Sequence, residues 1–90
     1  MKIYPVSRFI VEDNSMTPSY YPGDHVLTFN WIIPKENDVI VFRKENQLFI
    51  KRIIKMKERK YNCRGDNKKD SKIDYQVLSE DVVGKIVFKY

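Results

Sequence analysis

The stretch Asp13-Asn14-Ser15-Met16-Thr17-Pro18 is closed by Pro22-Gly23-Asp24 and continues directly into an apolar segment. Pro18 fixes its own backbone angle and biases the residue before it away from helix. Gly23 can take the positive backbone angles that let a chain double back into a strand. The stretch therefore predicts a constrained turn that presents the hydroxyl of Ser15, although the same residue types also build ordinary surface loops.

Short apolar or alternating segments, separated by turn residues, make up most of the remaining chain. A sustained period of 3.6 residues is not found, so the pattern predicts strands and not helices. We expect an all-β, mainly antiparallel chain whose single sheet curls and partly closes. The expected strands cover residues 8–11, 25–29, 38–43, 47–56, 58–63 and 81–88, with a bend or helical turn at 15–20, a tight turn at 44–46 and a polar loop at 64–74.

Length and composition are those of one small globular unit. The chain has 90 residues, of which 42% are hydrophobic and 32% charged, so we expect a single domain over residues 1–90. Cys63 is the only cysteine and His25 the only histidine. An intrachain disulfide is therefore excluded, and a zinc site would have to rely on carboxylates. We expect neither a metal nor another cofactor.

A second stretch, Gln47–Lys55, places two cations inside a strand pattern. Period-2 alternation puts Lys51 between Phe49 and Ile53 on one face and Arg52 on the other, so we expect one cation inside and one at solvent. A lysine removed from water loses hydration of its charged form, which lowers its pKa. A neutral amine can take the proton of a nearby hydroxyl, as in a Ser-Lys dyad, whereas an ordinary strand lysine extends its amine to water.

Taken together, the two stretches resemble the serine-lysine peptidases, which comprise the type I signal peptidases and the LexA-type self-cleaving repressors. The resemblance extends from about Val11 to Val87, and the order and spacing of its motifs are more specific than any motif alone. It implies the curled, partly closed sheet of these catalytic domains and is closest to a soluble signal-peptidase-like domain. The motifs are Ser15-Met16-Thr17-Pro18, Pro22-Gly23-Asp24, Asp38-Val39-Ile40-Val41-Phe42, Ile50-Lys51-Arg52-Ile53-Ile54, Gly65-Asp66-Asn67 with Ser71, and Val82-Val83-Gly84-Lys85-Ile86.

The resemblance implies a serine endopeptidase that hydrolyses a peptide bond through an acyl-enzyme. Ser15 would be the nucleophile and its backbone N–H an oxyanion donor, Lys51 would be the general base, and Ser71 would orient the lysine amine. Other residues would support the loop or form walls of the substrate pocket. Support is expected from Asp66, Asn67 and Asp74, and pocket walls from Met16, Tyr20, Tyr21 and the loop at Trp31.

Some positions depart from the family pattern. Asp13 stands two residues before Ser15, where many signal peptidases have Ser or Gly. A carboxylate aimed at an oxyanion would repel it, so Asp13 is expected to face away, to be protonated or to mark a weakened site. Asn37 stands where the family favours Gly, and Asp74 is displaced by one residue from the family's aspartate. His25 lies outside the motif of the base and is expected to be structural.

Two alternative functions remain open. A LexA-like self-cleaving repressor domain typically cuts between Ala or Cys and Gly, but this chain has no Ala, and Pro22, Arg64 and Val83 precede its three glycines. A non-catalytic binding module could instead use a basic face over residues 51–72, which hold ten of the seventeen Lys and Arg residues of a chain with net charge +5.

The expected partner is a polypeptide substrate that binds in extended form beside a strand; nucleic acid is not expected. The loop Trp31-Ile32-Ile33 could touch a membrane surface or a partner, or cap the core. No apolar run approaches the roughly 18 residues that span a bilayer, and the N-terminal residues lack the apolar core of a secretory signal. We therefore expect a soluble chain that is cytoplasmic or peripheral to a membrane, and we make no prediction of its oligomeric state.

Overall fold

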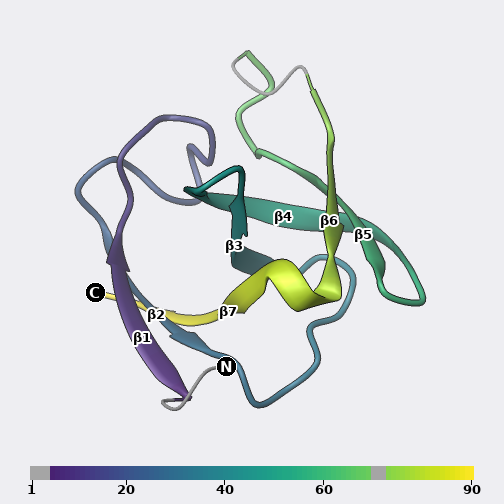
Figure 1. Ribbon diagram of the computed structural model, residues 1–90. Coiled ribbons are helices and arrows are strands. Elements are labelled where there is room, and N and C mark those ends of the chain that lie inside the picture. Colours follow the sequence, from purple (N-terminus) through teal and green to yellow (C-terminus); the bar gives the residue numbers. More distant parts are fainter. Residues whose placement is uncertain (1–4, 70–72) are drawn as a thin grey trace.

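The computed structural model describes residues 5–69 and 73–90, and in this part the regular structure is one antiparallel sheet (Figure 1). Its strand order is β1-β2-β7-β3-β4-β5-β6, and the edge strands β1 and β6 are not paired with each other. The all-β, antiparallel, curled sheet expected from the sequence is therefore confirmed. The elements are β1 (Val6–Ile10), β2 (His25–Phe29), β3 (Val39–Lys44), β4 (Gln47–Lys57), β5 (Lys60–Arg64), β6 (Tyr75–Leu78), the 3-10 helix η1 (Ser79–Asp81) and β7 (Val82–Lys89).

The turns explain where the expected strand limits agree and where they do not. The β3–β4 hairpin turns at Glu45 and Asn46, which both have positive φ (53° and 65°), the geometry of a two-residue I′ turn. Glu58 also has a positive φ of 56°, so β5 begins after it at Lys60 and not at Glu58. Strand β6 was not expected, since its four residues offer too short a pattern next to a polar loop.

The sheet coils enough to bury side chains on both faces of β3. Alternate residues of β3 enter two clusters, so that Val39 and Val41 lie in one and Ile40 and Phe42 in the other. The first cluster also holds Val11, Met16, Val26, Val83 and Ile86, and the second holds Ile53, Tyr61, Cys63 and Val77. The first cluster reaches the predicted turn, because Met16 in that turn is one of its members.

Gly84 of β7 lies where the sheet has no room for a side chain. A Cβ at this position would be 2.9 Å from Cβ of Thr28 on β2, and Thr28 is buried. We expect Gly84→Ala to lower the free energy of unfolding by about 1–3 kcal/mol, as overpacking does. Urea unfolding measures this loss. As a control, Val87→Thr at an exposed position of the same strand should change it by no more than about 0.5 kcal/mol, and equal losses in both variants would contradict the prediction.

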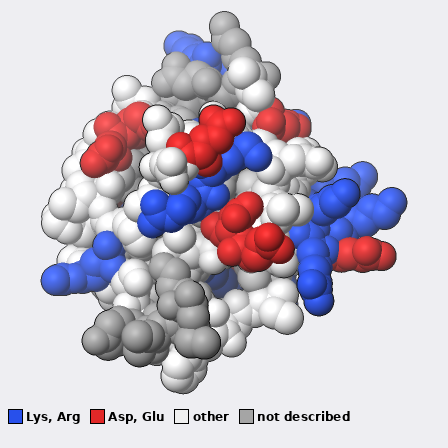
Figure 2. Space-filling view, in the orientation of Figure 1, with Lys and Arg blue, Asp and Glu red and all other residues white. Residues whose placement is uncertain are grey.

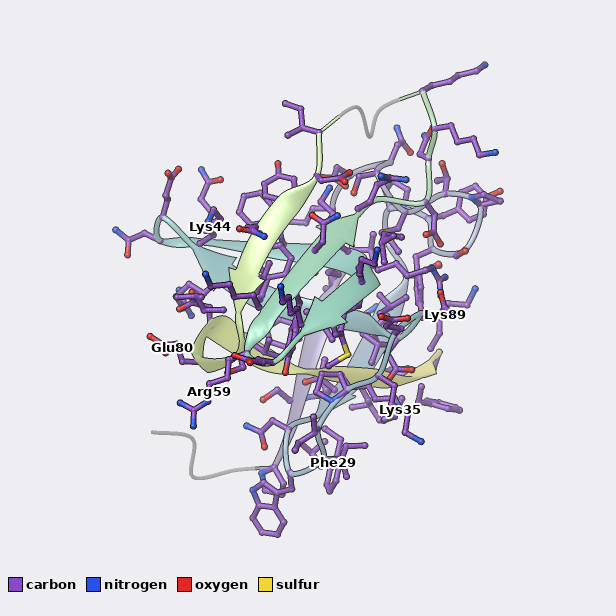
Figure 3. All side chains as sticks on the ribbon, turned by 90° about the vertical axis from the view of Figure 1, so that its right-hand side faces the viewer. Phe29, Lys35, Lys44, Arg59, Glu80 and Lys89 are labelled. Atoms are coloured by element: carbon purple, nitrogen blue, oxygen red, sulfur yellow. The ribbon has the colours of Figure 1, made fainter. Side chains whose placement is uncertain are left out.

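The loop between β2 and β3 exposes three large apolar side chains. Trp31, Ile32 and Ile33 are 69%, 44% and 79% exposed, so they do not cap the core. The loop follows Phe29, which lies at the end of the molecule opposite the loop that joins β5 and β6 (Figures 1 and 3). Within the described residues, no helix is long and apolar enough to cross a membrane.

The basic residues between 51 and 72 do not form one face. Lys51 is buried, Arg52 pairs with Asp66, and Arg64 pairs with Asp74. Several exposed cations of this stretch gather at the end of the β4–β5 hairpin, where Figure 2 shows a basic cluster on the right, whereas the exposed Lys68 and Lys69 lie in the loop after β5. This cluster consists of Lys55, Lys57, Arg59 and Lys60, with Glu58 among them.

Candidate active site

Ser15 lies in a turn between β1 and β2 whose two ends are joined by backbone hydrogen bonds. Val11 N–H donates to the carbonyl of Asp24 at 2.9 Å, and Gly23 N–H donates to the carbonyl of Val11 at 2.8 Å. Gly23 has a φ of 95°, which residues with a Cβ rarely adopt. Met16 is 1% exposed and anchors the turn in the core. The constrained turn predicted around Ser15 is therefore present.

The loop after β5 holds the Ser15 turn from the side through Asn67. Asn67 N–H donates to the carbonyl of Ser15 at 2.8 Å, and Asn67 Nδ2 donates to the carbonyl of Asn14 and to Thr17 Oγ1, both at 2.9 Å. These bonds join segments about 50 residues apart in the sequence, as the separation of Asn67 and Thr17 shows. Asn67 therefore links the loop after β5 to the turn that holds Ser15.

Asp66 links the same turn to β4. Its carboxylate accepts hydrogen bonds from Ser19 Oγ at 2.7 Å and from Arg52 Nε and Nη2 at 2.9 and 2.8 Å. Burial by itself would raise the pKa of Asp66, but the hydrogen bonds from Arg52 and Ser19 and the charge of Arg52 outweigh it and lower this pKa. Arg52 also donates from Nη1 to the carbonyl of Asn37 at 2.7 Å, and Asn37 has a φ of 77°. That left-handed angle is one that Asn tolerates, which explains why Asn can stand in place of Gly.

Asp66→Asn is expected to lower the free energy of unfolding by about 1–3 kcal/mol, because Arg52 would lose its charged partner. The pKa of Asp66 is lowered in the folded state, so its stabilising effect is present above the ordinary value of 3.8 and is lost as pH falls through the folded pKa. Urea unfolding at neutral and acid pH measures both effects. The matched control is Asp74→Asn, which breaks the more exposed pair with Arg64 and should cost less. A larger loss from the control would contradict the prediction.

Asp74, just before β6, is hydrogen-bonded to side chains of β5. It accepts hydrogen bonds from Arg64 Nε and Nη2 at 2.6 and 2.9 Å and from Asn62 Nδ2 at 3.0 Å. The hydrogen bond from Arg64, with that from Asn62, lowers the pKa of Asp74 to about 2. Its described partners all lie on β5, so the displaced aspartate holds the β5–β6 connection. Ser71, expected to orient the lysine amine, lies outside the described residues.

Lys51 is a buried lysine on β4, paired with Ile40 of β3 and only 7% exposed. Its amine lies 5.3 Å from the ring centroid of Tyr75 on β6, a contact that sequence reasoning missed because β6 was not foreseen. Burial lowers the pKa of Lys51, and the charge of Asp13 partly opposes this. The amine makes no ion pair with a carboxylate of the described residues. Of the two strand cations, Lys51 is the inner one.

Asp13 accepts a hydrogen bond from the backbone N–H of Ser15, the group that the family resemblance predicts to be an oxyanion donor. The backbone N–H of Ser15 donates to Asp13 Oδ1 at 3.0 Å. The side chain therefore does not face away from the turn, the first of the arrangements expected for it. In this conformation the N–H of Ser15 is directed at a carboxylate oxygen, and sequence reasoning had no signal for this bond beyond the residue type of Asp13.

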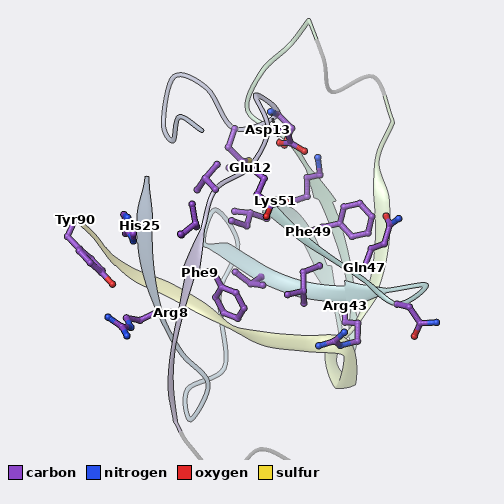
Figure 4. A pocket seen from close by; sticks show the side chains of 18 residues that line it. Arg8, Phe9, Glu12, Asp13, His25, Arg43, Gln47, Phe49, Lys51 and Tyr90 are labelled. Atoms are coloured by element: carbon purple, nitrogen blue, oxygen red, sulfur yellow. Dashed lines mark hydrogen bonds between the residues drawn. The ribbon is translucent and has the colours of Figure 1, made fainter. Parts of the chain in front are cut away.

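Ser15 and Lys51 line one cavity of about 1110 Å³, together with Asp13 and Met16 (Figure 4). Lys51 and Asp13 lie at the same end of this cavity (Figure 4). Its other walls come from β1 and the residues after it, from the β3–β4 hairpin, from His25 of β2 and from Tyr90 after β7. Three of the expected walls, namely Tyr20, Tyr21 and the Trp31 loop, do not line it: Tyr20 packs on the core, whereas Tyr21 and Trp31 are exposed.

The cavity separates two strand edges that have no partner in the described part of the chain. Strand β1 pairs only with β2, and residues Gln47–Lys51 of β4 pair only with β3, because pairing with β5 begins at Arg52. Both segments contribute to the cavity walls. An extended peptide placed between them could therefore form main-chain hydrogen bonds with either edge.

Comparison with known proteins identifies a family whose sequence model matches this chain. The model of a family described as Peptidase S24-like matches residues 6–87 of the chain. No curated protein matches the chain.

Proposed function

Because the chain belongs to the Peptidase S24-like family, we propose that it is a serine peptidase that hydrolyses peptide bonds with a Ser15–Lys51 dyad. One observation carries the proposal: a lysine with a lowered pKa, buried on β4, lines the same cavity as a serine on a constrained turn. A pKa lowered by burial increases the share of neutral amine near pH 7, and only a neutral amine can act as a base.

In the proposed reaction, Ser15 Oγ attacks the carbonyl carbon of the scissile bond, and the neutral amine of Lys51 takes the hydroxyl proton. The tetrahedral intermediate collapses when the protonated Lys51 gives that proton to the leaving amine, which leaves an ester on Ser15. Lys51, again neutral, then takes a proton from water as the water attacks the ester. The carboxylic acid product leaves, and Ser15 regains its proton. No cofactor enters this sequence.

The substrate proposed for this site is a polypeptide in extended form. It would lie between β1 and residues 47–51 of β4, where both backbone edges lack a described partner. Met16 would contribute to the apolar wall beside the cleaved bond.

The second candidate, self-cleavage next to glycine, has less support from the structure. Gly84 is buried within β7 and Gly65 is buried at the end of β5. Gly23 is fixed in the turn by its hydrogen bond to Val11. Cutting before any of these glycines would require strand or turn residues to leave their hydrogen bonds, so we propose that the cleaved bond is not one of these three.

A random-sequence decapeptide library, incubated with the purified chain, tests the proposal. We expect new peptide termini by mass spectrometry and, after acid quenching, an acyl adduct on the fragment that contains Ser15. Ser7→Ala on β1 is the control, since it removes a hydroxyl outside the proposed dyad. It should leave cleavage unchanged. Cleavage of no peptide, by the natural chain or by any variant that keeps Ser15 and Lys51, would contradict the proposal.

A further inference from the structure

The backbone N–H of Ser15 already donates to an anionic oxygen. Asp13 Oδ1 accepts it at 3.0 Å. In the proposed reaction, the same N–H should stabilise the oxyanion of the tetrahedral intermediate. One N–H cannot donate a full, well-aligned hydrogen bond to two oxygens at once. The carboxylate of Asp13 and the oxyanion therefore compete for one place.

Because both competing groups are negatively charged, the carboxylate and the oxyanion cannot both lie beside the N–H of Ser15. A carboxylate and an oxyanion repel each other when both lie beside the same donor, and the repulsion is strong where water is partly excluded. Asp13 is exposed, and its carboxylate makes no other hydrogen bond and no ion pair with a described residue. Turning this side chain into solvent would therefore break a single described hydrogen bond.

The charge of Asp13 also reaches the base. Burial lowers the pKa of Lys51, and the charge of Asp13 raises it again. Among the described residues, Asp13 supplies the charge that acts on this amine, and the ring of Tyr75 on β6 lies 5.3 Å from it. A lysine that stays protonated cannot accept the proton of Ser15. One carboxylate thus opposes the lowering of the pKa of Lys51 and also accepts the backbone N–H of Ser15.

We propose that Asp13 is an inhibitory positioning residue, whose carboxylate occupies the oxyanion position and must turn out of the site before acyl transfer can occur. This inference rests on the proposed function of the site. A peptide strand lying along β1 would bring its scissile carbonyl to Ser15 and displace the carboxylate. Binding of the substrate would thereby free the N–H of Ser15 to donate to the oxyanion.

Asp13→Ala tests the inference on whichever library peptide the natural chain or this variant cleaves fastest. We expect kcat to rise about tenfold or more, since an oxyanion donor is typically worth about 100-fold or more in kcat. KM should change less than about threefold, because the carboxylate opposes the transition state more than substrate binding. The midpoint of the pH–rate profile should move to lower pH. The matched control is Asp24→Ala, which removes a carboxylate that accepts the N–H of Tyr21 at 2.8 Å in the same loop and should change neither quantity.

Asp13→Asn separates the effect of charge from that of hydrogen bonding. It also tests the inference if Asp13→Ala does not fold. It keeps an acceptor for the N–H of Ser15 but removes the charge, so the midpoint should again move to lower pH. An unmoved midpoint in this variant, or an unchanged or lower kcat in folded Asp13→Ala, would overturn the inference. Failure of the proposed function looks different, because then no variant cleaves any peptide.

Discussion

Lys51→Met is expected to lower kcat for peptide cleavage by about 10²–10⁴-fold, the usual effect of removing a general base. Methionine has nearly the length of lysine without the amine, and its sulfur can pack near an aromatic ring, here Tyr75, 5.3 Å from the amine in the natural chain. The cavity wall should therefore keep its shape while the base is lost. Steady-state cleavage of the fastest library peptide measures the change.

Urea unfolding of the variant and the pH dependence of the cleavage rate are the controls for this prediction. Because the pKa of Lys51 is lowered from 10.5 in the folded chain, the charged amine destabilises the native state at neutral pH, and this penalty fades as pH rises toward 10.5. Lys51→Met should consequently unfold at no lower urea concentration than the natural chain at neutral pH. The cleavage rate of the natural chain should rise with pH through the lowered pKa. A folded Lys51→Met variant that retains natural kcat would show that Lys51 is not the base.

The strand pattern and the positions of Pro and Gly together predicted the two strand cations and the turn around Ser15. Alternation along residues 47–55 identified Lys51 and Arg52 as cations on opposite faces, and the structure buries the first and pairs the second with Asp66. The Pro and Gly positions predicted the turn around Ser15, because those residues restrict or enlarge the backbone angles locally. These features depend on residues that are close together in the sequence, so they can be predicted from the sequence alone.

Contacts between distant segments could not be predicted in the same way. The bond of Ser19 to Asp66 spans 47 positions, and the amine of Lys51 meets Tyr75 of a strand that has only four residues. Such contacts depend on how far the sheet coils, which follows from packing of the whole core. The bond from Ser15 N–H to Asp13 is local, but a carboxylate two residues before a serine can also point to solvent. The choice between these rotamers is made by the turn and not by the residue type.

The two strand edges beside the cavity show how the coil creates the site. Strand β5 leaves β4 at Arg52, so the first half of β4 keeps an open edge, and coiling places it across the cavity from the open edge of β1. Open edges are ordinarily a risk, since they can pair with another chain. In a peptidase the same property is useful, because the other chain is the substrate.

Ser15→Ala is expected to reduce kcat by about 10³–10⁶-fold, the range found when a covalent nucleophile is removed from a serine peptidase. The acyl adduct on the Ser15 fragment should disappear as well. Met16 and Asn67 hold the turn through burial and through the carbonyl of residue 15, so the fold should be unaffected. The double variant with Lys51→Met decides whether the two residues act as a unit. Because the base has no function without its nucleophile, the double variant should be no slower than Ser15→Ala alone. A further loss of about 10²-fold or more would mean that Lys51 acts independently of Ser15, and the dyad would have to be abandoned.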